Sequence, residues 1–102
     1  MPSRPRKSAA EERLEALDAI FAALDHPARR QILMTIHLRG GSVAAGDIAA
    51  RFAHSWPTTT RHLGVLEASG LLSVEQSGRT RIYSVRLERL KLVQEWLAWF
   101  DR

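Results

Sequence analysis

The chain has 102 residues, a formal net charge of +4 and a pI of about 10.6, and it contains no cysteine. This length predicts one domain, and the lack of cysteine excludes disulfides, thiolate metal sites and thiol switches. No apolar run approaches the roughly 18–20 residues of a membrane span, and no apolar stretch follows the basic N-terminus as in a secretory signal. We therefore expect a cytoplasmic protein without a membrane partner, and the positive charge favours a polyanion such as nucleic acid.

Residues 1–10 predict a flexible basic tail, because they hold two prolines, two serines and three positive charges. Such a tail can bind phosphate as a basic arm, but a solvated terminus is the simpler interpretation. Residues 11–102 are expected to form the single folded domain. Its first segment, residues 11–24, predicts a helix, since four apolar side chains recur at helical spacing: Leu14, Leu17, Phe21 and Leu24.

A second helix is predicted to begin at Pro27, since proline is tolerated at the first helical position, and to end at the glycine pair 40–41. Its apolar stripe consists of Ile32, Leu33 and Ile36. His37 lies beside this stripe and is expected to be a partly buried histidine, not a metal ligand. The next segment predicts a short strand at 42–43 and a short helix whose inner face is apolar: Ile48, Ala49 and Phe52.

The stretch "SWPTTTRHLGVLEASG", residues 55–70, predicts a helix with an unusual first turn. Ser55 can cap it by accepting a backbone N–H, and a proline or β-branched threonines disturb the first turn least. At 100° per residue, three side chains point inward: Thr59, Leu63 and Leu66. His62 lies at the edge of this inner face, and the outer face and its flanks carry Pro57, Thr58, Thr60, Arg61 and Gly64.

A β-hairpin is predicted for residues 72–85, where apolar and polar side chains alternate on both sides of a turn at Gly78. Residues 87–102 return to helical spacing, with one apolar face that is widened by Leu92, Trp96 and Trp99. The expected fold class is mainly α with a small β-hairpin, made of about five helices. The short helix and the helix at 55–70 then form a helix-turn-helix, and the hairpin behind it forms a wing.

In such a unit the second helix of the motif enters the major groove of DNA by its N-terminal residues. Threonine offers a hydroxyl and a methyl group to base edges, and arginine can donate two parallel hydrogen bonds to guanine. The N-terminus of a helix favours the binding of phosphate. The two wing arginines are placed to hold the DNA backbone. Two roles are open to Trp56, stacking on sugar–phosphate or bracing the turn. The predicted DNA-binding residues are Ser55, Trp56, Pro57, Thr58, Thr60, Arg61, Arg79 and Arg81.

Four segments in combination resemble the ArsR/SmtB family of winged-helix bacterial regulators: "LDHPARRQIL" (24–33), "GDIAARF" (46–52), "TTTRHLGVLEASGLL" (58–72) and "SGRTRIYSV" (77–85). The resemblance covers roughly residues 14–100 and implies a homodimer that binds double-stranded operator DNA near its own promoter, usually as a repressor. It also implies that the first and last helices form the dimer interface, which would bury the wide apolar face of the last helix. The residues expected there are Leu14, Leu17, Phe21, Leu90, Val93, Trp96, Leu97 and Phe100.

Two departures from the family pattern stand out. Many relatives carry a basic residue where this chain has Gly64, so that this position either cannot hold a phosphate or lets the backbone lie closer to DNA. The cysteines with which family members bind soft metals are missing, and no histidine follows His62 to complete a site on the last helix. We therefore expect no metal and no cofactor.

The sequence shows neither a nucleophile–base pattern nor a phosphate-binding loop, so we do not expect an enzyme. Two alternatives to a metal-independent DNA-binding regulator stay open. One is a metal-responsive sensor with a non-standard site of histidines and carboxylates. The other is a winged-helix module that uses the same surface to bind a protein.

Overall fold

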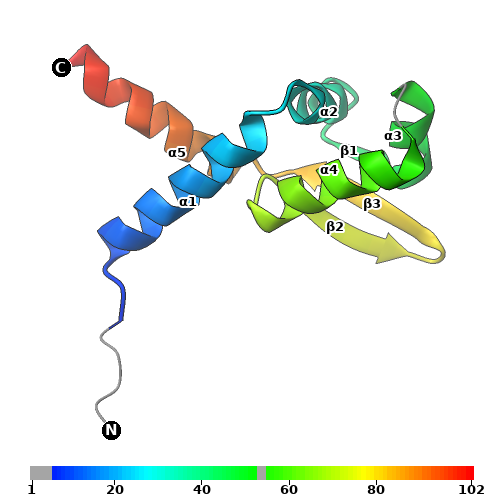
Figure 1. Cartoon of the computed structure of the whole chain (residues 1–102), viewed down its shortest axis with the longest axis horizontal. Coiled ribbons are helices and arrows are strands. Elements are labelled where there is room, and N and C mark those ends of the chain that lie inside the picture. Colours follow the sequence, from blue (N-terminus) through cyan, green and yellow to red (C-terminus); the bar gives the residue numbers. More distant parts are fainter. Residues whose placement is uncertain (1–5, 53–54) are drawn as a thin grey trace, which may run out of the picture.

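The computed structural model describes residues 6–52 and 55–102. The helices in this part are α1 (Ala9–Leu24), α2 (Pro27–Leu38), α3 (Ala45–Arg51), α4 (Trp56–Ala68) and α5 (Leu87–Ala98), followed by the short 3-10 helix η1 (Trp99–Asp101). The strands are β1 (Ser42–Ala44), β2 (Leu72–Ser77) and β3 (Thr80–Val85). The order of elements in Figure 1 is the predicted one, so the winged helix-turn-helix fold is confirmed.

Helix α1 begins at Ala9, two residues before its predicted start. The hydroxyl of Ser8 accepts a hydrogen bond from the backbone N–H of Glu11 at 3.1 Å and caps the helix. Lys7 adds an exposed ion pair, with 2.6 Å between its Nζ and Oε1 of Glu15. Residues 8–10 therefore belong to the start of α1 and not to the tail, while residues 1–5 of the predicted tail lie outside the described residues.

The three strands and helices α1, α2, α3 and α4 enclose one apolar core. The strands lie in the order β1-β3-β2 and all pair antiparallel. The central Tyr83 aligns with Val43 of β1 on one side and with Val74 of β2 on the other. The helices contribute buried side chains to the same cluster: Ile20, Ile32, Ile36, Ile48, Leu63 and Leu66. Since the wing is the end of this packed sheet, the core sets its position relative to α4.

The prediction that His37 is partly buried was wrong, because its side chain is exposed. Its neighbour Ile36 is fully buried. The next residue along a helix lies about 100° further around the axis, which takes His37 past the apolar stripe to the outer flank of α2.

Helices α1 and α5 project from the body on the side away from the wing tip (Figure 1). We call this part the α1–α5 arm. The Cα radius of gyration is 15.8 Å, against about 13 Å for a compact chain of 100 residues. Helix α5 has no fully buried residue. No helix in residues 6–52 or 55–102 combines the length and apolar character that a membrane crossing requires.

Candidate nucleic-acid interface

Ser55 holds the first turn of α4, as the sequence predicts. Its backbone is extended, and its hydroxyl oxygen accepts a hydrogen bond from the N–H of Thr58 at 3.4 Å. The same hydroxyl donates to Oγ1 of Thr58 at 3.0 Å. Pro57 lies in this first turn, where its missing N–H leaves no helical bond unmade. The unusual sequence therefore forms a regular, capped helix start.

Helix α4 presents opposite faces to the core and to solvent in the predicted register. Thr59 and Leu63 are each 1% exposed, and Leu66 is fully buried. Thr58 is half-buried, and the rest of the predicted outer face is exposed: Pro57, Thr60, Arg61 and Gly64. This face brings together hydroxyl, methyl and guanidinium groups, which are the groups that read base edges in a major groove.

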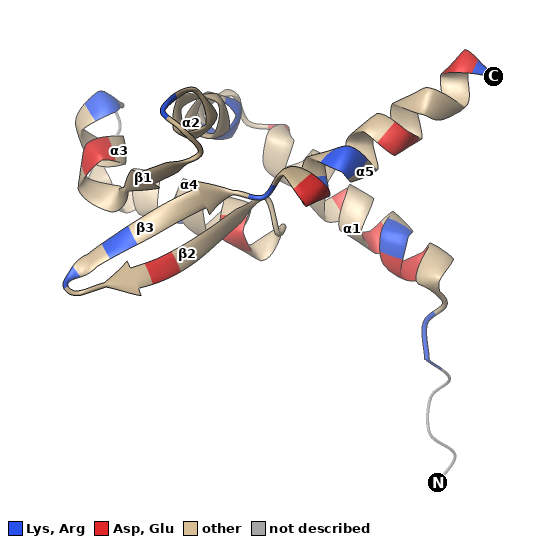
Figure 2. Ribbon diagram, turned by 180° about the vertical axis from the view of Figure 1, so that it is seen from behind, with Lys and Arg blue, Asp and Glu red and all other residues tan. Residues whose placement is uncertain are grey.

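The wing closes through a two-residue turn at Gly78 and Arg79. Ser77 pairs with Thr80 at the end of the ladder, and Gly78 has a φ of +62°, a conformation that glycine adopts without steric penalty. The side-chain amide of Gln76 donates to the carbonyl of Gly78 at 3.0 Å. Arg79 and Arg81 are exposed, so that basic positions mark the wing tip and β3 (Figure 2).

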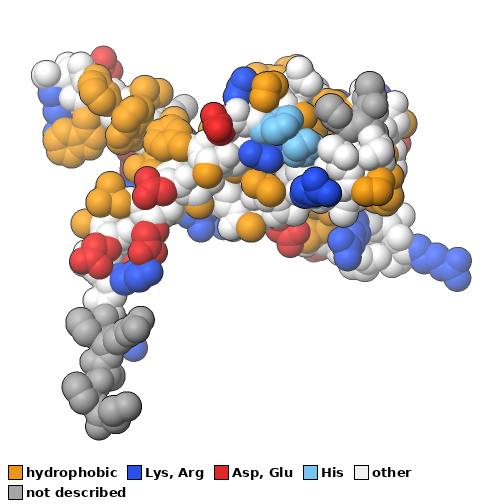
Figure 3. All heavy atoms as spheres, viewed as in Figure 1, with side chains coloured by type: hydrophobic (Ala, Val, Ile, Leu, Met, Phe, Trp, Pro, Cys, Tyr) orange, Lys and Arg blue, Asp and Glu red, His pale blue; other side chains and the backbone are white. Residues whose placement is uncertain are grey.

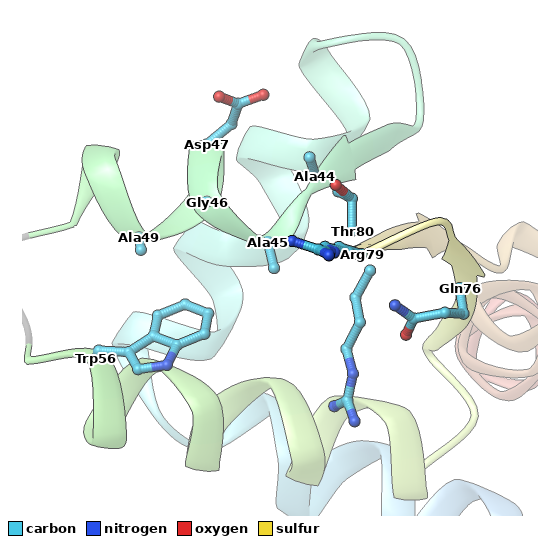
Figure 4. A pocket seen from close by; sticks show the side chains of 10 residues that line it. Ala44, Ala45, Gly46, Asp47, Ala49, Trp56, Gln76, Arg79 and Thr80 are labelled. Atoms are coloured by element: carbon cyan, nitrogen blue, oxygen red, sulfur yellow. The ribbon is translucent and has the colours of Figure 1, made fainter.

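A groove of about 710 Å³ runs between the wing, α3 and the start of α4 (Figure 4). We call it the α3–wing groove. Trp56 is 50% exposed and lines the groove from the first turn of α4. The wall formed by α3 and the end of β1 is built mainly of small residues, with one acid: Ala44, Ala45, Gly46, Asp47 and Ala49. The wing wall consists of Gln76, Arg79, Thr80 and Arg81. An open groove with two arginines on one wall suits an extended polyanion such as one strand of DNA.

Behind α4 lies a polar cluster that helical periodicity does not predict. The rings of His26 and His62 are 4.4 Å apart between centroids, and His62 is only 6% exposed. Nη1 of Arg29 lies 3.4 Å from Nδ1 of His62, and Nε of Arg29 donates to the carbonyl of Ala23 at 2.6 Å. Nδ1 of His26 accepts the N–H of Ala28 at 3.1 Å and caps α2. Residues from α1 and α2 thus hold the inner face of α4. The one sequence signal for this cluster was a histidine at the edge of that face.

Comparisons with known proteins agree with this geometry. Residues 24–75 match a family model described as a helix-turn-helix domain. The chain is 33% identical over 84 residues to the transcriptional repressor SdpR of Bacillus subtilis (strain 168), covering 82% of this chain and 91% of that protein. The solved structure of an ArsR family transcriptional regulator is 32% identical, with a TM-score of 0.77 and coverage of 85% of this chain and 88% of that one.

The chain belongs to the ArsR family of winged helix-turn-helix transcriptional regulators. The family expected from the four sequence segments is therefore confirmed. The same fold occurs in a homodimeric winged helix-turn-helix DNA-binding domain from Mycobacterium bovis, studied by NMR in solution. That domain is 20% identical, with a TM-score of 0.71 and coverage of 97% of this chain and 91% of that one.

The ArsR-family chain shows no metal cluster in its described part. Within residues 6–52 and 55–102, no three His, Asp or Glu side chains come together as a metal ion would require. The adjacent pair His26 and His62 is a poor metal site, because Nδ1 of His26 already accepts a hydrogen bond from a backbone N–H. In addition, the cationic Arg29 lies at Nδ1 of His62 and would repel a metal ion.

The residues predicted for a dimer interface lie on the α1–α5 arm of this ArsR-family regulator, and most of them are exposed. Exposed fractions are 61% for Leu14, 37% for Phe21, 40% for Trp96, 53% for Leu97 and 72% for Phe100. Figure 3 shows hydrophobic side chains gathered on this arm.

Three aromatic rings of the arm form a continuous row. The ring of Trp96 meets Phe21 edge to face at 5.2 Å and Phe100 at 5.1 Å between centroids. Leu90 and Val93 are half-buried. Leu17, in contrast, is only 6% exposed and packs within its own chain, so it has little surface left for a partner.

Proposed function

We propose that the protein is a homodimeric repressor that binds a near-palindromic operator close to its own promoter. One observation carries this proposal: the first turn of α4, through Trp56, lines one groove with the wing residues Arg79 and Arg81. The outer face of the same helix, with Arg61, is exposed. The first turn of α4 enters a major groove. There Thr58, Thr60 and Arg61 meet base edges and supply the choice of sequence.

The DNA backbone occupies the α3–wing groove in this proposal. Arg79 and Arg81 hold phosphates, which contributes affinity and salt dependence but little sequence preference. The capped first turn, with Ser55 and Pro57, presents the helix N-terminus to a phosphate. Trp56 packs on a sugar–phosphate unit, since a residue that only braced the turn would not leave half of its surface exposed in the groove.

Two chains pair through their α1–α5 arms. The exposed aromatic row supports this pairing, because isolated soluble chains rarely leave such apolar patches in water. The homodimeric state of the Mycobacterium bovis domain with the same fold also supports it. The pair then sets two α4 helices over successive major grooves, and the bound dimer excludes polymerase by occupancy. The proposal contains no metal, no cofactor and no catalytic step.

Fluorescence anisotropy of labelled duplexes tests the proposal. One duplex carries the DNA directly upstream of the protein's own coding sequence, and a second carries the same bases scrambled. We expect the upstream duplex to bind more tightly. Arg61→Ala should remove most of that preference, because a forked arginine–guanine contact contributes about 1–3 kcal/mol of discrimination.

The matched control is Arg39→Ala, which removes an exposed cation at the end of α2 and belongs neither to α4 nor to the wing. It should leave the preference for the upstream duplex intact. Equally weak, steeply salt-dependent binding of both duplexes would contradict a sequence-specific repressor. In that case a protein partner on the same surface becomes the better hypothesis.

A further inference from the structure

A second concave site lies where the α1–α5 arm joins the rest of the fold, which consists of α2, α3, α4 and the sheet and which we call the body. It is a pocket of about 280 Å³ between the end of α1, helix α2, the end of β3 and the start of α5, and we call it the hinge pocket. Its aliphatic lining consists of Leu24, Leu33, Met34, Val85, Leu87 and Leu90. This volume lies just below the range of roughly 300–1,000 Å³ that is typical of sites for drug-sized molecules, which fits a smaller ligand.

The two remaining lining residues carry side-chain nitrogen atoms. They are Arg30 and His37, and no Asp or Glu lines the pocket. Nη1 of Arg30 donates to the carbonyl of Leu24 at 2.6 Å, which fixes the guanidinium beside the pocket and leaves its other N–H groups to bind an anion. Both basic side chains are exposed, and so are Met34 at 58% and Leu87 at 51%. An aliphatic pocket with a basic, accessible rim has the chemistry to bind an apolar molecule with one carboxylate.

We infer that the hinge pocket binds a small apolar carboxylate and that its occupancy changes the affinity for DNA. The ligand touches Leu24 and Leu90 on the arm, and it touches Leu33 and Val85 on the body. The arm orients the two bodies of a dimer, so a ligand that favours one arm–body angle also favours one spacing of the α4 helices. The binding step stands by itself, whereas the effect on DNA rests on the proposed function.

Isothermal titration calorimetry of the full chain with octanoate tests the binding step. The matched probe is 1-octanol, which has the same chain length and no charge. We expect one octanoate per chain, bound about fivefold more tightly than 1-octanol, as one exposed charge contact with Arg30 allows. Arg30→Gln should reduce this difference and leave 1-octanol binding unchanged. The assignment would be overturned if octanoate showed no saturable binding. It would also be overturned if both probes bound equally well and Arg30→Gln changed neither affinity.

A pair of tryptophan substitutions locates the site. Met34→Trp fills the pocket from an exposed position on α2 and should abolish octanoate binding. Leu38→Trp adds the same ring on the same helix, at a residue that is 75% exposed and does not line the pocket, so it should have no effect. If Met34→Trp instead weakens the dimer in sedimentation equilibrium and octanoate does not bind, the pocket holds side chains of a second copy and the inference is wrong.

The regulatory step is measured by repeating the anisotropy titration with saturating octanoate. We expect operator affinity to change by at least about fivefold, and octanoate affinity to change by the same factor when DNA is present, because coupling between two sites is reciprocal. The change should be absent in Met34→Trp. Octanoate binding without any change in DNA affinity would overturn the regulatory step alone. Failure of the chain to bind DNA at all would overturn the proposed function and leave the calorimetric result standing.

Discussion

The hydroxyl of Ser55 is the side-chain group that caps α4, the helix proposed to read DNA. Ser55→Ala removes the acceptor for the N–H of Thr58. We expect the free energy of unfolding to fall by about 1 kcal/mol, the usual effect of losing an N-cap. Urea denaturation followed by circular dichroism measures this change, at one fixed chain concentration so that any dimer contributes equally.

The control for Ser55 is Ser55→Asp, because aspartate caps helices as well as serine does. Its stability should stay near that of the unaltered chain. Its affinity for DNA should fall, since a carboxylate then stands where a phosphate is proposed to lie. Unchanged DNA binding in Ser55→Asp would show that this end of α4 does not approach the DNA backbone.

Two glycines of the α4 region should respond to alanine in opposite directions. Gly70 has a φ of +82°, and a Cβ built there meets the side chain of Arg89. Gly70→Ala should therefore lower the free energy of unfolding by about 1–2 kcal/mol. Gly64 is exposed within the helix, and a Cβ there meets nothing within 4 Å, so Gly64→Ala should raise stability by about 0.5–1 kcal/mol. The same urea experiment compares the two, and a loss of stability in Gly64→Ala would contradict the open geometry of the outer face.

At the scale of single residues, the inner and outer faces of α4 could be predicted because a 100° period alone determines them. The contact between Arg29 and His62 could not, since it joins residues 33 positions apart and depends on how α2 crosses α4. The exposure of His37 was mispredicted for a related reason. Periodicity places a residue next to a stripe, but only the packed neighbours decide whether anything covers it.

At the scale of elements, the wing should control how DNA binding depends on salt. The double variant Arg79→Gln and Arg81→Gln should weaken binding to the upstream and scrambled duplexes alike. Because the proposed homodimer carries each arginine twice, the variant should also reduce the slope of log affinity against log salt by about 4, roughly one for each phosphate that is no longer neutralised. Anisotropy titrations over a salt series measure the slope.

Thr80→Ala provides the control within the wing, because this exposed residue lies between the two arginines and carries no charge. It should leave the salt slope unchanged. If the double variant kept the salt slope of the unaltered chain, the wing arginines would remain in solvent when DNA is bound. The α3–wing groove would then not be the site that holds the DNA backbone.

The order of elements could be read from the sequence because each boundary has local chemistry, such as Pro27 at the start of α2 or the left-handed Gly70 after α4. The α3–wing groove and the hinge pocket could not be read in this way. Each lies between elements that are distant in the sequence, so its shape follows from their packing. The residues that line the hinge pocket come from α1, α2, β3 and α5, and no motif marks them as a set.

At the scale of the whole molecule, the arm has exposed apolar surface that one chain leaves unburied. Leu97, on this surface, is 53% exposed, so Leu97→Asp should be tolerated by the single chain. In a dimer that buries this face, an unpaired buried carboxylate weakens association of the two chains by several kcal/mol. We therefore expect circular dichroism to show that Leu97→Asp is folded and sedimentation equilibrium to show that it is monomeric. It should bind the operator far more weakly, because each particle then contacts one half-site and not two. Leu38→Asp, at a residue that is 75% exposed on α2, should remain dimeric. A dimeric Leu97→Asp variant, or equal dissociation of both variants, would show that the chains do not pair through the α1–α5 arm.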